Sequence, residues 1–310
     1  MEKALFSDFL NEYKNKKLAI CTHIKPDADS LVSAFAVSSV LKNSVICVPD
    51  FPSDKWMNLV EKLGFEIRIL KNLNKSDFDG LVVVDTSTFV LLPDAKGWDI
   101  KLIIDHHRSE GRDMESPYKI IDSDSPSCAE IIADILPEIN ESVAFGLAVG
   151  VIADGARFKS ARKNTFSTLA KMMDICKSDY SDLLSYAEPE LSVEEKLALI
   201  KAMQRVEFVT SGTWLIVTSE VGAHEGDASS LLAEIADVAF VASWKPAEKE
   251  CRISSRAGNK FPVPLNEVMN EVGKSLGGDG GGHAKAAGAV AKCHTEEALK
   301  KCVEVVMSKL

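Results

Sequence analysis

The stretch Lys101-Leu102-Ile103-Ile104-Asp105-His106-His107 decides how the rest of the chain is interpreted. Its apolar, largely β-branched residues predict a buried strand over residues 100–104. That strand runs directly into one acid and two imidazoles. In an open α/β sheet, ligands bind just beyond the carboxyl ends of the strands, so this position predicts a functional site. The alternative is that Asp105 caps a turn and that the histidines face solvent.

Two other apolar strands also end in residues that are common metal ligands. The first, KLAIC, leads into a turn with His23, Asp27 and Asp29, and the second, LVVV, leads into Asp85. One acid of the first turn is explained as a helix cap, but a cap needs only one carboxylate. Asp154, which a glycine follows, would alone indicate only a turn. Beside the other acids it forms a fourth cluster.

The order of the expected elements predicts the fold class. Continuous apolar strands alternate with helical stretches, which is typical of an α/β protein with a doubly wound, mainly parallel sheet. An acidic, proline-containing stretch at 186–192 predicts a domain boundary. We therefore expect a metal-binding domain over 1–188, a connecting helix over 189–206 and a smaller α/β domain with a mixed sheet over 207–310.

Composition limits the classes of function. The formal net charge of −10 argues against sequence-independent coating of long nucleic acid, although a short nucleotide in a local basic site stays compatible. The N-terminus lacks a long apolar segment, which favours a soluble, cytoplasmic protein without a membrane partner. The seven cysteines form no CxxC pair, so neither a zinc knuckle nor a disulfide framework is indicated.

The ligand types at the strand ends point to a particular metal chemistry. Carboxylates and imidazoles without thiolate suit Mn²⁺ well, with Mg²⁺, Co²⁺ or Zn²⁺ as substitutes. The set exceeds the needs of one cation, whereas two cations about 3.5–4 Å apart that share a carboxylate would use it fully. Such a pair supports in-line displacement at phosphorus. The chain has no Gly-x-x-x-x-Gly-Lys-Ser/Thr loop, so a nucleoside triphosphatase of that type is not supported.

These motifs resemble a known family over nearly the whole chain. The motifs His23-x-x-x-Asp27-x-Asp29-Ser30, Asp85, Asp105-His106-His107 and Asp154 are similar to the four motifs of the DHH phosphoesterase superfamily. The segment Gly280-Gly281-Gly282-His283-Ala284-Lys285-Ala286-Ala287-Gly288 resembles the signature of its DHHA1 domain. The size of two domains, without an added OB-type domain, is similar to the nanoRNase/pAp-phosphatase branch.

The resemblance implies two sets of metal ligands that share one bridging residue. The first set is His23, Asp27 and Asp85, and the second set is Asp29, Asp85, His107 and Asp154. Asp85 would also belong to the catalytic machinery, with Asp105 orienting the histidines and His106 facing the scissile phosphate. In the second domain, the resemblance implies a nucleotide-binding role for Arg256 and for a loop formed by Gly281, Gly282 and His283.

We therefore expect a hydrolase, an Mn²⁺-dependent phosphoesterase that cleaves short oligonucleotides or nucleotide phosphates and acts as an oligoribonuclease-type exonuclease. Hydrolysis of cyclic dinucleotides is an alternative, and inorganic pyrophosphatase activity is disfavoured because the second domain resembles DHHA1. A non-catalytic nucleotide sensor is a further alternative, although a sensor would not need every acid. A homodimer is compatible with the sequence, which leaves substrate length and polarity open.

Overall fold

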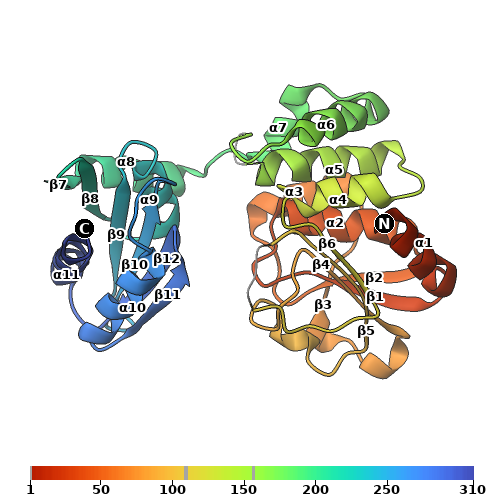
Figure 1. Ribbon diagram of the computed structural model, residues 1–310, viewed down its shortest axis with the longest axis horizontal. Coiled ribbons are helices and arrows are strands. Elements are labelled where there is room, and N and C mark those ends of the chain that lie inside the picture. Colours follow the sequence, from red (N-terminus) through yellow and green to blue (C-terminus); the bar gives the residue numbers. More distant parts are fainter. Residues whose placement is uncertain (1, 108–110, 156–157) are drawn as a thin grey trace. The chain divides into compact units, whose positions relative to one another are not determined.

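The computed structural model describes residues 2–107, 111–155 and 158–310, and the chain forms two compact units (Figure 1). Unit 1 comprises Met1–Glu190 and unit 2 comprises Leu191–Leu310. The division falls within the acidic, proline-containing stretch at which the sequence predicts a domain boundary. Within the described ranges, no helix combines the length and apolar character that crossing a membrane requires.

Unit 1 is built on a six-stranded parallel sheet with the order β3-β2-β1-β4-β5-β6. The strands are β1 (Lys17–Cys21), β2 (Asn43–Val48), β3 (Arg68–Ile69), β4 (Gly80–Val84), β5 (Ile100–Asp105) and β6 (Tyr118–Ile121). The α-helices are α1 (Glu2–Tyr13), α2 (Ala28–Ser38), α3 (Asp54–Leu63), α4 (Cys128–Ile135), α5 (Glu141–Asp154), α6 (Lys163–Cys176) and α7 (Tyr180–Ala187). Three short 3₁₀ helices are η1 (Leu70–Asn72), η2 (Lys75–Asp77) and η3 (Pro93–Ala95).

The strand order reverses direction between β1 and β4, which are neighbours in the sheet. From β1 the chain builds outward through β2 and β3, and it then returns to start the other half at β4. The loops that follow β1 and β4 consequently diverge at the carboxyl edge. Open α/β sheets bind their ligands at such a switch point. We therefore expect a site at the carboxyl ends of β1 and β4.

Both faces of the parallel sheet are buried, which explains why its strands are continuously apolar. On one face, Val82 and Val84 of β4 pack into the core formed with α2, α4 and α5. On the other face, Leu81 and Val83 pack with Leu92 from the segment between β4 and β5. Full burial of each such side chain contributes about 1.5–3 kcal/mol to folding. The two cores hold the strand ends in fixed positions.

Unit 2 is built on a mixed six-stranded sheet with the order β11-β12-β10-β9-β8-β7, antiparallel except between β8 and β9. The strands are β7 (Glu207–Ser211), β8 (Trp214–Glu220), β9 (Val238–Lys245), β10 (Glu250–Ala257), β11 (Asp279–His283) and β12 (Ala286–Ala291). The helices are α8 (Val193–Gln204), α9 (Glu225–Leu232), α10 (Leu265–Ser275) and α11 (Thr295–Ser308). Helices α8 and α9 pack against one face, and α10 and α11 pack against the other.

The architecture confirms the predicted fold class, an α/β unit with a parallel sheet followed by a smaller α/β unit with a mixed sheet. Apart from the short 3₁₀ helices, which were not predicted, three elements differ from the expectation. The glycine run expected as a loop forms the edge strand β11, because main-chain pairing with β12 overrides the low β propensity of glycine. The short elements β7 and α7 were not predicted, since both lie beside the expected boundary, where local pattern is weak.

Candidate metal centre

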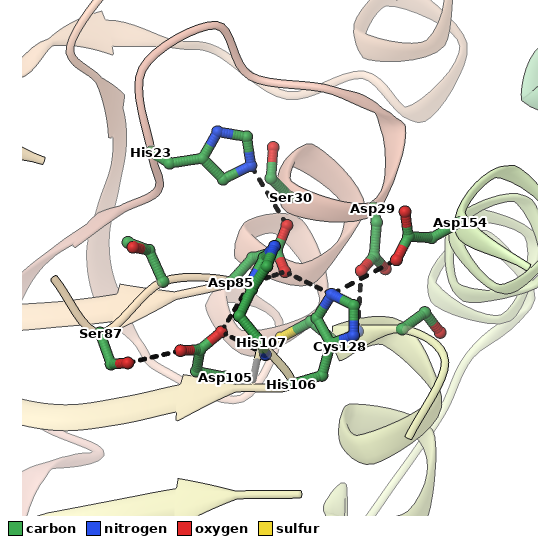
Figure 2. Close-up of polar contacts among 12 residues, drawn as sticks. His23, Asp29, Ser30, Asp85, Ser87, Asp105, His106, His107, Cys128 and Asp154 are labelled. Atoms are coloured by element: carbon green, nitrogen blue, oxygen red, sulfur yellow. Dashed lines mark hydrogen bonds and ion pairs between the residues drawn. The ribbon is translucent and has the colours of Figure 1, made fainter. Parts of the chain in front are cut away.

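The polar residues at the carboxyl edge of the parallel sheet converge on one site (Figure 2). They come from the ends of β1, β4 and β5, from the beginning of α2 and from the last turn of α5. The set comprises His23, Asp27, Asp29, Asp85, Asp105, His106, His107 and Asp154. Segments separated by more than 100 residues therefore contribute to a single cluster at the switch point of the sheet.

Asp85 lies at the centre of this cluster, and its side chain is 3% exposed. Its Oδ2 is 3.3 Å from Nε2 of His23, and its Oδ1 is 3.4 Å from Nε2 of His106 and 3.8 Å from Nδ1 of His107. Its backbone φ of 61° is uncommon for a residue other than glycine and is a form of strain often found at functional sites. Oδ1 is buried without a hydrogen-bond partner among the described residues.

Three groups of potential ligand atoms surround Asp85, and the atoms within each group lie within 4.8 Å of one another. The groups are His23, Asp27 and Asp85; Asp85, His106 and His107; and Asp29, His106 and Asp154. Asp85 and His106 each belong to two groups. An arrangement in which one carboxylate serves two adjacent groups is what a pair of closely spaced cations requires.

The two histidines of the motif differ in their surroundings. His106 is 12% exposed, with Nδ1 3.2 Å from the Ser125 carbonyl oxygen and Nε2 3.3 Å from Oδ2 of Asp154. His107 is 43% exposed, and its Nδ1 is 2.8 Å from Oδ1 of Asp105. The family resemblance implied that His107 would lie beside Asp29 and Asp154. In the structure, His106 lies there instead. The division of roles between the two rings stays a prediction.

Asp105 fixes the orientation of His107. Its Oδ1 also accepts a hydrogen bond from the His107 backbone N–H at 3.1 Å, and its Oδ2 accepts one from Ser87 Oγ at 2.6 Å. Burial raises the pKa of Asp105, but the bonds from His107 and Ser87 outweigh burial and lower it. Ser87 was not recognised from sequence as a site residue; its position two residues after Asp85 was the only signal.

Asp29 links α2 to α4. Its Oδ2 accepts from the Cys128 N–H at 2.7 Å and its Oδ1 from the Ala129 N–H at 2.9 Å. These groups begin α4, and a helix N-terminus favours a negative charge. Gly150 of α5 lets this carboxylate approach, because a Cβ there would lie 3.0 Å from Asp29 Oδ1 and 2.6 Å from Val32 Cγ2. Neither contact was predicted from sequence.

Asp27 performs the capping role that the sequence analysis considered. As N-cap of α2 it accepts a hydrogen bond from the Ser30 N–H through Oδ1 at 3.1 Å. Its other oxygen, Oδ2, lies 4.0 Å from Nε2 of His23. One carboxylate therefore caps the helix and still presents an oxygen to the cluster.

The electrostatics of the cluster fit a bound cation. Burial, together with the charges of Asp85 and Asp154, raises the pKa of Asp29, and burial raises that of Asp154 to about 6. Burial would lower the pKa of the rings, but Asp85 and other acids raise it to about 9 for His23 and about 10 for His106. Positive charge stabilises crowded carboxylates and a buried Asp85 Oδ1 that has no hydrogen bond among the described residues. Oxygen and imidazole donors match Mn²⁺ or Mg²⁺.

The four predicted substrate-binding residues lie together in unit 2. Across β10, β12 and β11, Arg256 and His283 are both register partners of Ala286. Gly281 and Gly282 continue along β11, and Gly282 has a φ of 135°, which favours glycine. Burial lowers the pKa of Arg256, which Asp227 partly opposes. The sheet of unit 2 thus carries a cation, an imidazole and, at Gly281, a backbone with nothing within 4 Å of the position that a Cβ would take, whereas a Cβ at Gly282 would lie 2.7 Å from the Ala286 carbonyl oxygen.

Comparisons with known proteins bear on both units. Residues 17–151 match the DHH family, N-terminal domain, and residues 213–310 match the DHHA1 domain. Two uncharacterized proteins of Methanocaldococcus jannaschii are 29% and 26% identical, cover 97% and 94% of this chain, and are covered over 95% and 63% of their own lengths. An exopolyphosphatase-related protein from Bacteroides fragilis has the same fold, with a TM-score of 0.80, 17% identity, and coverage of 99% of this chain and 96% of that one. The chain therefore contains a DHH family N-terminal domain followed by a DHHA1 domain.

Proposed function

We propose that the protein is a metal-dependent phosphoesterase that hydrolyses short oligonucleotides or nucleotide phosphates, with two Mn²⁺ ions as the preferred cofactor. The observation that carries the proposal is the position of Asp85, whose two oxygens face different ligand groups and whose Oδ1 lacks a hydrogen-bond partner in the described structure. The domain match supports phosphoester hydrolysis in general. The substrate and the identity of the metal belong to the proposal.

The residues fall into holding and orienting roles. His23, Asp27 and Asp85 would hold one cation, and Asp29, Asp85, His106 and Asp154 would hold the other. When bound, such a pair supplies an activated water near neutral pH and neutralises charge on the phosphoryl oxygens. The protein's part is to hold these ligands rigidly, and the two cores beneath the strand ends and the α4 amides on Asp29 do so.

His107 would contact the phosphate. Asp105 occupies its Nδ1, which leaves Nε2 of this half-exposed ring as the nitrogen without a hydrogen bond among the described residues. The hydrogen bond that the His107 ring donates to Asp105 raises the pKa of His107, which favours a ring that also donates a hydrogen bond to a phosphoryl oxygen. Asp105 thereby acts as a positioning residue, and Ser87 fixes Asp105 in turn.

We place nucleotide recognition in unit 2. Arg256 supplies a cation for phosphate, and the β11 backbone at Gly281 has nothing within 4 Å of the position a Cβ would take. His283 of β11 is paired with Ala286 of β12, the same residue with which Arg256 is paired. Contacts with parts of the substrate that do not react would let binding energy raise turnover only for substrates large enough to make those contacts.

Product analysis tests the proposal directly. The protein would be incubated with Mn²⁺ and labelled RNAs of two to five nucleotides, with pAp, with c-di-AMP and with pyrophosphate, and the products separated. We expect mononucleotides from short RNA, or AMP from pAp, and loss of product on adding EDTA with recovery on adding excess Mn²⁺. Exclusive cleavage of c-di-AMP would select the cyclic-dinucleotide alternative. Binding of nucleotide without any product would favour a sensor.

A further inference from the structure

The backbone of His107 lies beyond the last hydrogen bond that β5 makes with its neighbour β6. Strand β5 ends at Asp105, whose carbonyl oxygen accepts a hydrogen bond from the Asp122 N–H at 3.2 Å. His107 follows two residues later, and no described strand pairs with it. A side chain can be aimed at a substrate only as precisely as its own backbone is held. The contacts that hold this backbone therefore bear on catalysis.

Two side chains hold the peptide groups of His107. Asp105 Oδ1 accepts a hydrogen bond from the His107 N–H at 3.1 Å. Arg112 Nη2 donates to the His107 carbonyl oxygen at 2.8 Å and to Ser123 Oγ at 2.7 Å, and Ser123 Oγ lies 3.4 Å from the same carbonyl. Because Nη2 carries two N–H groups, one nitrogen can serve both acceptors. Arg112 thus ties the end of the Asp-His-His motif to the segment that follows β6.

Both acceptors of Arg112 are neutral oxygens, although arginine is the residue best suited to pair with a carboxylate. Within the described ranges, no carboxylate oxygen lies within 4.0 Å of its guanidinium. The adjacent acid, Asp113, is engaged elsewhere, because its Oδ1 accepts a hydrogen bond from the Phe89 N–H at 2.7 Å. The described contacts of Arg112 therefore fix backbone geometry and do not neutralise an acid.

We propose that Arg112 is a positioning residue that holds the His107 peptide so that the ring presents Nε2 to the phosphate. The inference rests on the proposed function, in which His107 contacts the phosphate. Asp105 fixes the ring at Nδ1 over 2.8 Å, but the ring still moves whenever its peptide moves. With Arg112 in place, the N–H, the carbonyl oxygen and Nδ1 of His107 are all restrained.

Steady-state kinetics test the role of Arg112. In Mn²⁺, on a short RNA that wild-type protein cleaves, Arg112→Ala should lower kcat about 10- to 100-fold, the scale for losing a residue that orients another. KM and metal stoichiometry should stay unchanged, because the metal ligands are untouched. Arg112→Lys should recover part of the loss, since its ammonium can still donate to the carbonyl. Arg68→Ala is the matched control: Arg68 is also exposed, on β3 at the opposite edge of the sheet, and its kcat should stay within about twofold.

A double-mutant cycle separates positioning from general support of the fold. In a His107→Ala background, Arg112→Ala should lower kcat by less than about twofold, because the ring that it positions is absent. Equal losses in the two backgrounds would overturn the proposal, since Arg112 would then act independently of His107. A wild-type kcat in Arg112→Ala would overturn it as well.

A measurement without substrate distinguishes failure of this inference from failure of the proposed function. In protein with Mg²⁺, which is diamagnetic, ¹³C relaxation at Cε1 reports how rigidly the His107 ring is held, and His107→Ala assigns the signal. Arg112→Ala should lower the order parameter of this ring and leave that of His283, in unit 2, unchanged. An unchanged His107 order parameter would overturn the positioning role. A looser ring in a protein that cleaves no phosphoester would confirm the restraint and refute the proposed function alone.

Discussion

At the scale of single residues, the buried carboxylate of Asp85 gives the most specific prediction. Its buried, strained position is stable only if its charge is compensated, and the nearest compensation is three imidazoles. Asp85→Asn keeps the shape and removes the charge. We expect it to lose both Mn²⁺ binding, measured by calorimetry, and hydrolysis of every substrate. Asp122→Asn, a carboxylate change outside the three ligand groups, is the comparison. Retention of two tightly bound ions in Asp85→Asn would contradict the bridging role.

The paired histidines allow a sharper test, because they are adjacent and differ in burial. His106→Ala removes an imidazole shared by two ligand groups and should abolish one metal site. His107→Ala should bind both ions nearly normally yet lose about 10²–10³ in kcat, the scale for one lost transition-state donor. Metal stoichiometry by atomic absorption, beside kcat, separates the outcomes. The reverse pattern would restore the division of roles that the family resemblance implied.

Residue identity was the part of the site that the sequence could predict. His23, Asp85 and Asp105 follow apolar strands, so parallel pairing had to bring them to one edge. The sequence could not show which imidazole turns inward, because that choice depends on Asp105 capturing Nδ1 of His107. It also could not show the unusual φ of Asp85, since backbone strain is set by the surrounding packing.

At the scale of elements, the site depends on how closely α5 approaches α2 and α4. Gly150→Ala would introduce a methyl group within 2.6 Å of Val32 Cγ2 and 2.8 Å of Ala129 Cβ. Overpacking of this kind costs about 1–3 kcal/mol, more than the gain in helix propensity of about 1 kcal/mol. We expect a lower free energy of unfolding in urea, together with weaker Mn²⁺ binding because Asp29 is displaced. Gly146→Ala, whose nearest new contact would be 3.2 Å, should cost less.

Arg162 joins three elements of unit 1. At the start of α6, it donates to Glu130 of α4 at 2.8 Å and to Asp122, which follows β6, at 2.9 Å. Glu130 is fully buried, so Arg162→Gln would leave an unpaired charge inside the protein and cost about 2–4 kcal/mol. Urea denaturation measures the cost, with exposed Lys163→Gln as control. If Glu130→Gln in the Arg162→Gln background restored nothing, the charge would not be the cause.

The same ion pair predicts a pH dependence. Burial raises the pKa of Asp122, but Arg162 outweighs burial and lowers it. A lowered folded-state pKa contributes stability above the ordinary Asp pKa of about 3.9, and that contribution is lost as pH falls through the lowered value. Wild-type protein should therefore lose stability below about pH 4 more steeply than Arg162→Gln does. Circular dichroism would follow the stability of both proteins as the pH is lowered. If the two proteins lost stability equally steeply below about pH 4, the Asp122–Arg162 pair would not be a source of acid sensitivity.

At the scale of the whole molecule, the fold class was predictable and the details of unit 2 were less so. Continuous apolar strands alternating with helices have few solutions other than a covered parallel sheet, and β1, β4 and β5 follow that expectation. β11 escaped prediction because its glycines carry no strand pattern, and only β12 supplies the register. β7 escaped because an exposed edge lacks the alternation that burial imposes.

The separation of ligands and recognition residues into different units predicts separable effects on catalysis. All potential ligands of the centre lie in unit 1, whereas Arg256 and His283 lie in unit 2. Arg256→Ala and His283→Ala should therefore keep both metals and near wild-type hydrolysis of a nitrophenyl phosphodiester. On dinucleotides or pAp they should lose about 2–4 kcal/mol of transition-state stabilisation, the range for removing one partner of a desolvated charge pair.

The control for this experiment comes from the same strand. Arg252 lies four residues from Arg256 on β10, is half exposed and forms ion pairs with Glu248 and Glu250. Its charge is thus already compensated, and Arg252→Ala should reduce kcat/KM on dinucleotides much less than Arg256→Ala does. Equal losses on the small and the large substrates in Arg256→Ala would mean that this residue supports folding or chemistry instead of recognition. If Arg252→Ala and Arg256→Ala reduced kcat/KM equally, the nucleotide would be attracted by positive charge in general and not by the specific position of Arg256 beside His283.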